Sequence, residues 1–348
     1  MPLNKKKKKK TGPIVVIVLV VLMLLLLLTV YLLFLHFYNK TNYIPDEKST
    51  AAEEAGSEEA GTEEAGTEYV PEDVQKEVEE YTLSPEDMSE IDKNTSDTDP
   101  IPSLGGVYSV LLIGSDRRDS GWYGNSDAMI LFTINENTKK IYMTSFMRDM
   151  YANIPGYGGT RLNSAYALAG PTKLVDTIEQ NYGVKIDNYA SVDFDGLKAI
   201  VDALGGLDIE IKDYELPVFA SYGITSPGTY HLNGAEVLSY VRIRRYGYYD
   251  FERTQRQRRV MNLIMEKIRA GGVFQLPSTM DALLPYVTHN ISQGQMLKLM
   301  SGAGKYMKYP VEEYRVPEDG SYYEVNYILI PNDMGAVISG IRSRIYAK

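Results

Sequence analysis

The stretch "NYASVDFDGLKAIVDALGGLDIEIK", residues 188–212, predicts a strand, a helix and a second strand in direct succession. An aspartate stands near the start of the helical part, and Gly205 and Gly206 follow its end. Residues 207–212 then alternate between apolar and polar side chains, as a half-buried strand does. This order is typical of an α/β domain, in which helices cover a central sheet.

The same pattern continues toward the N-terminus. Residues 107–114 ("VYSVLLIG"), 128–135 ("AMILFTIN") and 140–146 ("KIYMTSF") predict three strands. Residues 171–183 ("PTKLVDTIEQNYG") predict a helix that begins at a proline and ends at a glycine. We expect residues 101–348 to form one α/β domain, although residues 271–348 carry no recognisable motif.

Residues 14–35, "IVVIVLVVLMLLLLLTVYLLFL", carry no charge and are long enough to cross a bilayer. Six lysines precede them, so the positive-inside rule places the N-terminus in the cytoplasm. We expect a basic cytoplasmic N-terminus (1–13), a single-pass transmembrane signal-anchor (14–38) and an extracellular remainder. A cleaved signal peptide is the alternative, and it would have a shorter apolar core followed by a small-residue cleavage site.

Residues 39–100 form a strongly acidic region. From residue 40 to residue 100 there are twenty Asp or Glu against four Lys, and the unit E-E-A-G repeats within residues 51–68. Such a segment has few large apolar side chains to bury, which predicts a disordered, low-complexity extracellular linker that holds the domain off the membrane. The net charge of −10 comes from this region, and residues 101–348 are neutral.

Several classes of chemistry are excluded or disfavoured by composition. The chain has no cysteine, so disulfides, thiolate catalysis and cysteine metal sites are excluded. Its three histidines, His36, His231 and His289, are scattered, which disfavours a Ser-His-Asp enzyme.

An arginine cluster stands out in the neutral domain. Residues 240–259, "YVRIRRYGYYDFERTQRQRR", hold seven of the fifteen arginines and no lysine. The planar guanidinium group matches phosphate oxygens with two parallel hydrogen bonds, so the cluster predicts a phosphate-rich ligand. An RNA-binding surface would need similar residues, but the domain is expected outside the cell.

The cluster divides by expected secondary structure. Two residues apart in an extended segment, Arg242 and Arg244 would point the same way. On a helix that begins near Asp250, the residues expected to share the ligand-facing side are Arg253, Arg256 and Gln257. We expect Arg258 and Arg259 to lie on other faces of that helix, in solvent.

Polar residues follow or precede the predicted strands. Asp116 and Arg118 follow the first strand, Asp127 precedes the second, and Arg148 and Asp149 follow the third. Ligands of α/β domains gather at such strand ends. Asp116 and Asp127 are the natural pair for Mg²⁺ or Mn²⁺, which together with the arginines would suit phosphoryl transfer. Simple salt bridges at loop ends are the alternative for each pair.

Several motifs occur in the order found in one known family. They are "LLIGSDRR", "NSDAMILFTIN", "SFMRDMYANIPGYG", "RLNSAYALAGP", "VDFDGLKAIVDALGGLDI", "HLNGAEVLSYVRIRR" and "DFERTQRQ". Through them residues 107–270 resemble the LytR-CpsA-Psr (LCP) family of membrane-anchored cell-wall enzymes. The chain departs from the family at Met147, where proline is common, and at Arg245, where histidine or a similar residue is usual.

The resemblance implies a three-layer α/β/α sandwich with a central mixed sheet and a lipid groove. It also implies a phosphotransferase that moves an anionic glycopolymer, of the wall teichoic acid or capsular polysaccharide type, from a polyprenyl (undecaprenyl) pyrophosphate carrier to peptidoglycan. In this interpretation Asp116 and Asp127 hold Mg²⁺, and Asp149, Asn163 and Asp250 position other groups. The pyrophosphate oxygens are bound by Arg118, Arg148, Arg242, Arg244, Arg253, Arg256 and Gln257.

Two other functions fit the same residues. Water in place of the sugar hydroxyl would make the protein a polyprenyl-pyrophosphate pyrophosphatase or phosphatase. A non-catalytic wall-binding regulatory module is the third possibility. A DNA-binding role is disfavoured because the expected cytoplasmic part has only about thirteen residues, too few for the known DNA-reading elements.

Overall fold

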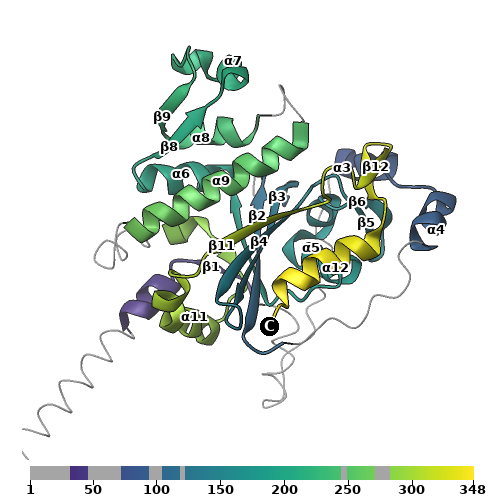
Figure 1. Cartoon of the computed structure of the whole chain (residues 1–348), viewed down its shortest axis with the longest axis horizontal. Coiled ribbons are helices and arrows are strands. Elements are labelled where there is room, and N and C mark those ends of the chain that lie inside the picture. Colours follow the sequence, from purple (N-terminus) through teal and green to yellow (C-terminus); the bar gives the residue numbers. More distant parts are fainter. Residues whose placement is uncertain (1–31, 46–71, 94–103, 118–121, 244–248, 271–282) are drawn as a thin grey trace, which may run out of the picture.

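A computed structural model describes residues 32–45, 72–93, 104–117, 122–243, 249–270 and 283–348 (Figure 1). The expected cytoplasmic N-terminus and most of the apolar run at residues 14–35 lie outside these ranges. Within them, no helix combines the length and the apolar character that crossing a bilayer requires.

A mixed seven-stranded sheet forms the centre of the described part of the chain, in the order β1-β10-β7-β2-β3-β4-β11. Three neighbouring pairs are parallel (β1 with β10, β2 with β7, β4 with β11), and the others are antiparallel. The strands are β1 (Asn42–Tyr43), β2 (Val107–Ser115), β3 (Ser126–Asn135), β4 (Lys140–Phe146), β7 (Asn188–Asp193), β10 (Thr288–His289) and β11 (Val311–Val316). The expected α/β fold with a mixed central sheet is confirmed.

The alternation of side chains along β2 shows how helices cover the sheet. Leu111 and Ile113 are buried in the main apolar core, which includes residues of α5 (Ser164–Tyr182) and α12 (Met334–Ile345). Leu112 points the other way, to a cavity lined by α6 (Phe194–Ala203) and α9 (Tyr249–Ala270). Figure 1 shows α5 and α12 on one side of the sheet and α6 and α9 on the other.

The helix expected at residues 171–183 is present. It forms the second part of α5, where Ala169 and Gly170 leave helical geometry and Pro171 begins the next turn. Gly183 ends α5 in the left-handed conformation, with φ of 59°, as a C-terminal glycine does.

The alternating strand expected at residues 207–212 is also present, but it lies outside the central sheet. As β8 (Leu207–Ile211) it pairs with β9 (Gly228–Leu232), and both pack with α8 (Gly234–Val241) around a second apolar core. Short helices connect the two strands: η2 (Asp213–Glu215), α7 (Leu216–Phe219) and η3 (Ala220–Tyr222).

Residues 271–348 complete the domain in their described part. They supply η4 (Leu284–Tyr286), β10, α11 (Gln293–Tyr306), β11, β12 (Tyr322–Val325), β13 (Ile328–Pro331) and α12. β11 extends the sheet beside β4, and β12 pairs with β13 near the hairpin of β5 (Tyr151–Ile154) and β6 (Gly158–Arg161).

The folded unit also begins earlier than residue 101. Helices α3 (Glu72–Glu80) and α4 (Pro85–Lys93) pack on the main core through Val78 and Ile91, and Leu83 in the connection between them joins the same core. At the other end of the acidic region, β1 belongs to the central sheet. The range 39–100 is therefore not all linker, since residues at both of its ends belong to the domain.

Candidate functional site

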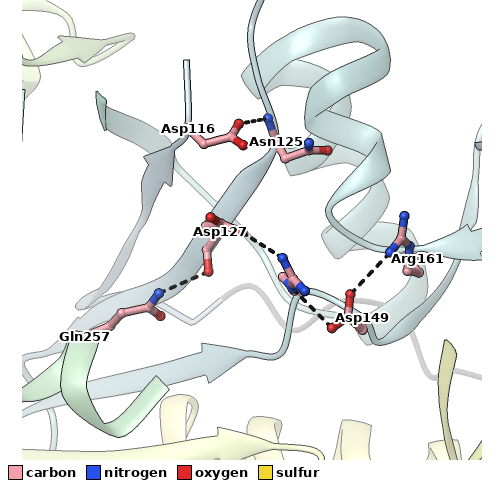
Figure 2. A network of polar contacts seen from close by, with 7 residues as sticks. Asp116, Asn125, Asp127, Asp149, Arg161 and Gln257 are labelled. Atoms are coloured by element: carbon pink, nitrogen blue, oxygen red, sulfur yellow. Dashed lines mark hydrogen bonds and ion pairs between the residues drawn. The ribbon is translucent and has the colours of Figure 1, made fainter. Parts of the chain in front are cut away.

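Polar side chains meet at one edge of the central sheet, as their positions in the sequence predicted. Asp116 follows the end of β2, Asp127 lies at the start of β3, and Arg148 and Asp149 follow the end of β4. Because β3 runs antiparallel to both β2 and β4, its start lies beside their ends. Figure 2 shows Asp116, Asp127 and Asp149 around this edge.

Arg148 connects the two aspartates nearest to it. Its Nη1 donates to Oδ1 of Asp127 at 3.1 Å, and its Nε donates to Oδ2 of Asp149 at 3.1 Å. Arg161, at the end of β6, continues the chain of alternating charges with Nη1 at 3.7 Å from Oδ1 of Asp149. All four side chains are less than one fifth exposed. Such partly buried ion pairs hold their geometry more firmly than surface pairs.

Arg161 is a member that the sequence analysis did not single out. It stands at the start of the motif "RLNSAYALAGP", so a signal was present in the sequence. Its guanidinium also lies over the ring of Tyr81, directly after α3, with Cζ at 3.9 Å from the ring centre.

A tight turn fixes Asp116. Its Oδ1 accepts a hydrogen bond from the backbone N–H of Asn125 at 2.5 Å (Figure 2). Gly124 has φ of 78°, and a side chain there would place its Cβ 2.6 Å from the backbone nitrogen of Arg117. Glycine therefore permits both the conformation and the close approach that this turn needs.

A pair of tyrosines packs beside this turn. The rings of Tyr123 and Tyr166 lie 5.7 Å apart, edge to face. Burial raises the pKa of Tyr166, although hydrogen bonds with Ser191 and Ser115 oppose this effect. The hydroxyl of Tyr166 therefore remains a hydrogen-bond donor at neutral pH.

An apolar cavity of about 330 Å³ lies between the sheet and the helices α6 and α9. Its apolar lining comes from three strands, from both helices and from η4, and includes Leu112, Ile130, Val192, Leu197, Ile264 and Leu284. Polar residues also line it, namely Ser115, Asp127, Asp193, Arg242, Arg253 and Gln257. The cavity therefore suits an amphiphilic ligand with an anionic head and an apolar chain.

Two polar residues of α9 face this cavity. Arg253 is a fully buried side chain with 1% of its surface exposed. Gln257, one turn later, donates from Nε2 to the backbone carbonyl of Asp127 at 3.1 Å, which joins α9 to the polar edge (Figure 2). The expectation that Arg253 and Gln257 share one face of a helix is confirmed.

Arg256 does not belong to this group. Its Nε donates to Glu215 and its Nη2 to Glu252, both at 2.7 Å, and its Nη1 donates to the carbonyl of Ile243 at 3.3 Å. These partners lie on the β8–β9 side of α9, and Arg256 does not line the cavity. Burial lowers the pKa of Arg256, but the two carboxylates raise it by more. Arg256 therefore holds α9 in place, contrary to its expected position at the ligand.

Two further expectations about the arginine cluster were wrong. Arg258 was expected in solvent, but its side chain is only 8% exposed and its Nε donates to Glu313 of β11 at 2.9 Å. Arg242 was expected in an extended segment, but it caps the C-terminus of α8, with its guanidinium 4.7 Å from the ring centre of Phe194. Arg259 was also expected in solvent, and its side chain is 37% exposed.

Asn163 lies behind Arg148. Its backbone N–H donates to the carbonyl of Arg148 at 3.1 Å, and its side chain is buried at the start of α5. This place fits a positioning residue. Arg118, Arg244 and the side chain of Asp250 lie outside the described residues.

The donor set suits a hard cation that also binds phosphate. Asp116 and Asp127 supply carboxylate oxygens, which Mg²⁺ and Mn²⁺ prefer, but no group of three or more His, Cys, Asp or Glu side chains gathers in the described ranges. The described side chains alone would thus supply few of the oxygen atoms that coordinate such a cation. Of the histidines, His231 pairs with Asp208 in the β8–β9 hairpin and His289 is buried in β10, so neither joins this site.

Comparison with known proteins places these features in one family. The LytR_cpsA_psr family model matches residues 72–336. The regulatory protein MsrR of Staphylococcus aureus (strain COL) is 34% identical over 223 residues, which are 64% of this chain and 68% of MsrR. The polyisoprenyl-teichoic acid–peptidoglycan teichoic acid transferase TagU of Bacillus anthracis (strain CDC 684) is 32% identical over 235 residues, which are 66% of this chain and 75% of TagU.

Solved structures share the fold as well. The structure described as TagT bound to LI-WTA aligns with a TM-score of 0.57 and 25% identity, over 72% of this chain and 94% of TagT. The family match spans well over half of the chain and includes every residue of the polar edge and of the cavity. The chain therefore belongs to the LytR-CpsA-Psr family.

Proposed function

We propose that this protein transfers an anionic glycopolymer, of the wall teichoic acid or capsular polysaccharide type, from a polyprenyl pyrophosphate carrier to peptidoglycan. One observation carries the proposal: an apolar cavity has Arg253, Gln257 and Asp127 in its lining, and Asp127 accepts a hydrogen bond from Arg148. This combination suits a lipid whose head is a pyrophosphate. TagU, which is 32% identical, is named as a transferase that joins teichoic acid to peptidoglycan.

The proposed reaction is a displacement at phosphorus. A sugar hydroxyl of peptidoglycan attacks the phosphorus bonded to the glycan, and the bond from that phosphorus to the bridging oxygen breaks. The proton of the hydroxyl passes to solvent, and polyprenyl phosphate leaves with the electron pair of the broken bond. In such reactions most of the catalysis comes from positioning and from stabilising charge on the phosphoryl oxygens.

Each part of the site has a role in this scheme. Arg253 and Arg148 bind pyrophosphate oxygens, and Gln257 keeps α9 against the start of β3. Asp149 and Arg161 hold the guanidinium of Arg148 in place. When bound by Asp116 and Asp127 together with phosphate oxygens, Mg²⁺ or Mn²⁺ would neutralise negative charge on the pyrophosphate.

We further propose that residues 14–35 anchor the chain in the cell membrane, with the N-terminus in the cytoplasm and the domain outside. The support is the uncharged apolar run with six lysines before it. A membrane anchor places the site on the same surface as a lipid-linked donor.

Full-length protein in vesicles that contain a lipid-linked pyrophosphate donor tests the proposal. With Mg²⁺ and peptidoglycan present, we expect glycan to become attached to peptidoglycan, and chelation of the metal to stop the reaction. The variants Asp127→Asn, Arg148→Lys and Arg253→Lys should each lower the rate by about 10²-fold or more, because each removes a preorganised charge or bidentate contact. Arg259→Lys is the matched control on the same helix and should keep the rate.

Two outcomes would contradict the proposal. Release of free phosphate without attachment of glycan would identify a pyrophosphatase. Unchanged attachment of wall polymer in cells that carry Asp127→Ala and Arg148→Ala would identify a non-catalytic wall-binding module.

A further inference from the structure

The short segment that follows the apolar run, residues 32–45, is part of the domain. Residues 32–38 are helical, and β1 then pairs with β10 at the edge of the central sheet. The backbone N–H of Asn42 donates to the carbonyl of Val287 at 3.1 Å, and that of Ile44 donates to the carbonyl of His289 at 2.8 Å. We call residues 32–45 the N-terminal segment.

Aromatic side chains fix this segment to the sheet. Tyr38 is buried, its hydroxyl donates to the carbonyl of Ile291 at 3.0 Å, and its ring packs edge to face on His289 at 5.9 Å. The ring of Tyr43 lies 5.8 Å from the same histidine ring. The contact therefore has both backbone and side-chain components.

The N-terminal segment also touches the wall of the apolar cavity. The side-chain amide of Asn42 donates to the carbonyl of Pro285 at 3.1 Å, and its backbone bonds to Val287. Leu284 and Val287, on either side of Pro285, line the cavity. Only about six residues separate the end of the apolar run at Leu35 from this hydrogen-bonded contact, which is at most about 20 Å of extended chain.

Exposed apolar side chains gather on the elements around this contact. Of the twelve large apolar residues that are exposed in the described part of the chain, eight lie on the N-terminal segment, on η4 and on α11 with its C-terminal cap. They are Leu32, Leu33, Tyr43, Ile44, Tyr286, Leu297, Met300 and Met307. Figure 1 shows the helix of residues 32–38 and α11 at the same end of the molecule, away from α7 and β12.

On α11 the exposed apolar residues follow helical spacing. Leu297, Met300 and Met307 are three and seven residues apart, which places them on one face. Lys298 and Lys305, about 80–100° from Leu297 around the helix, are also exposed, and Lys305 pairs with Glu136. Apolar side chains with tyrosines and lysines beside them are typical of surfaces that lie at a bilayer interface.

We propose that the N-terminal segment, η4 and the exposed face of α11 form a membrane-contact surface, which holds the part of the cavity wall made by Leu284 and Val287 against the lipid bilayer. This rests on the proposed function for its substrate, since the apolar chain of a lipid donor would then pass from the bilayer into the cavity without crossing water.

The contact with lipid is testable without any activity, because the chain has no native cysteine. Met300→Cys carries an environment-sensitive fluorophore in full-length protein reconstituted in vesicles, and Tyr327→Cys carries it in the control. Tyr327 is 71% exposed and lies in the β12–β13 turn. We expect lipids with a quencher near the head group to quench the label at 300 and to leave the label at 327 unchanged. Equal quenching at both positions, or none at 300, would overturn the proposal.

Pairing of β1 with β10 is tested in the same vesicles. Asn42 and Thr288 are direct partners in the two strands, so Asn42→Cys with Thr288→Cys should form a disulfide under mild oxidation and shift the band on a non-reducing gel. Asn39→Cys with Thr288→Cys is the control pair outside the register. Absence of the cross-link at 42 and 288, or equal cross-linking of the control, would show that β1 does not pair with β10 when the protein is in a membrane.

Delivery of the lipid is tested with two donors. Leu297→Asp with Met300→Asp should lower transfer from an undecaprenyl donor in vesicles by about tenfold, through loss of the effective concentration that docking provides. Transfer from a water-soluble geranyl donor should stay within about twofold, because the site itself is unchanged. An unchanged ratio of the two rates would refute the role in delivery. No transfer from either donor by the unmodified protein would refute the proposed function instead, and the fluorescence and cross-linking results would still stand.

Discussion

Arg256 is predicted to stabilise the protein and not to bind the substrate. The Arg256 side chain is 5% exposed and that of Glu215 is 2% exposed, and the two are joined at 2.7 Å. Replacing Arg256 with methionine leaves the carboxylate of Glu215 buried without its cation. We therefore expect Arg256→Met to lower the free energy of unfolding by about 3–5 kcal/mol.

A second substitution separates stability from substrate binding. In Glu215→Gln with Arg256→Met neither buried charge remains, and the glutamine keeps an acceptor for the backbone N–H of Lys212, which bonds to Glu215 at 2.9 Å. Replacing both members of a buried ion pair costs far less than removing one. The double variant should therefore recover to within about 2 kcal/mol of the wild type.

Thermal unfolding followed by circular dichroism measures the effect. At about 2–4 °C per kcal/mol for a domain of this size, the single variant should unfold roughly 6–20 °C below the wild type. Transfer activity, measured well below the unfolding temperature, should return in the double variant. If Arg256→Met unfolds at the wild-type temperature but loses transfer, or if the stable double variant stays inactive, Arg256 contacts the substrate and our assignment is wrong.

Three further predictions concern the turn at Gly124, the arginines of α9 and His289 in β10. Gly124→Ala should slow transfer about tenfold by displacing the turn that holds Asp116, whereas Gly156→Ala, with a similar positive φ but open space, should not. Initial rates of the folded variants measure this difference. Arg258→Ala should lower the free energy of unfolding by about 1–2 kcal/mol and Arg259→Ala by less than about 0.5 kcal/mol, because only Arg258 is buried. Equal losses of stability in urea unfolding would contradict this explanation. Burial lowers the pKa of His289, so its stabilising contribution is full above about pH 6.5 and falls as the pH drops below that value. His289→Asn should flatten this part of the stability profile, and an unchanged slope would assign it to other groups.

Long apolar patterns predicted β2, β3 and β4, and strict alternation predicted the shorter strand β8. β2, β3 and β4 each have seven or more residues, and most of these residues are buried. The short edge strands β1 and β10 have two residues each, so no periodicity marks them. Helices α3 and α4 were assigned to the linker for a related reason, because few of their side chains are apolar, although Val78 and Ile91 are buried in the core. The contact that fixes such elements comes from residues far away in the chain.

The polar edge was predictable because it depends on strand order alone. Any antiparallel neighbour of β2 and β4 brings its start beside their ends, so Asp116, Asp127 and Arg148 had to lie close together once the strands were recognised. Arg161 reaches the same edge from the β5–β6 hairpin, which pairs outside the central sheet. Strand order in the central sheet therefore does not predict the position of Arg161.

The arginines of α9 show where helical spacing alone stops being informative. At about 100° per residue, Gln257 lies roughly 40° ahead of Arg253 and Arg256 roughly 60° behind it. Val260, Met261 and Ile264 fall between roughly 20° behind Arg253 and 80° ahead of it, and all three line the cavity. Arg256 is thus just outside the cavity face, at an angle from which its side chain could contact either a ligand or another part of the protein. It contacts Glu215, 41 residues earlier in the chain, and not the cavity. An excess of arginine over nearby carboxylates is therefore weak evidence for a ligand when the helix is enclosed on several sides, because its partners come from β3, η2 and β11.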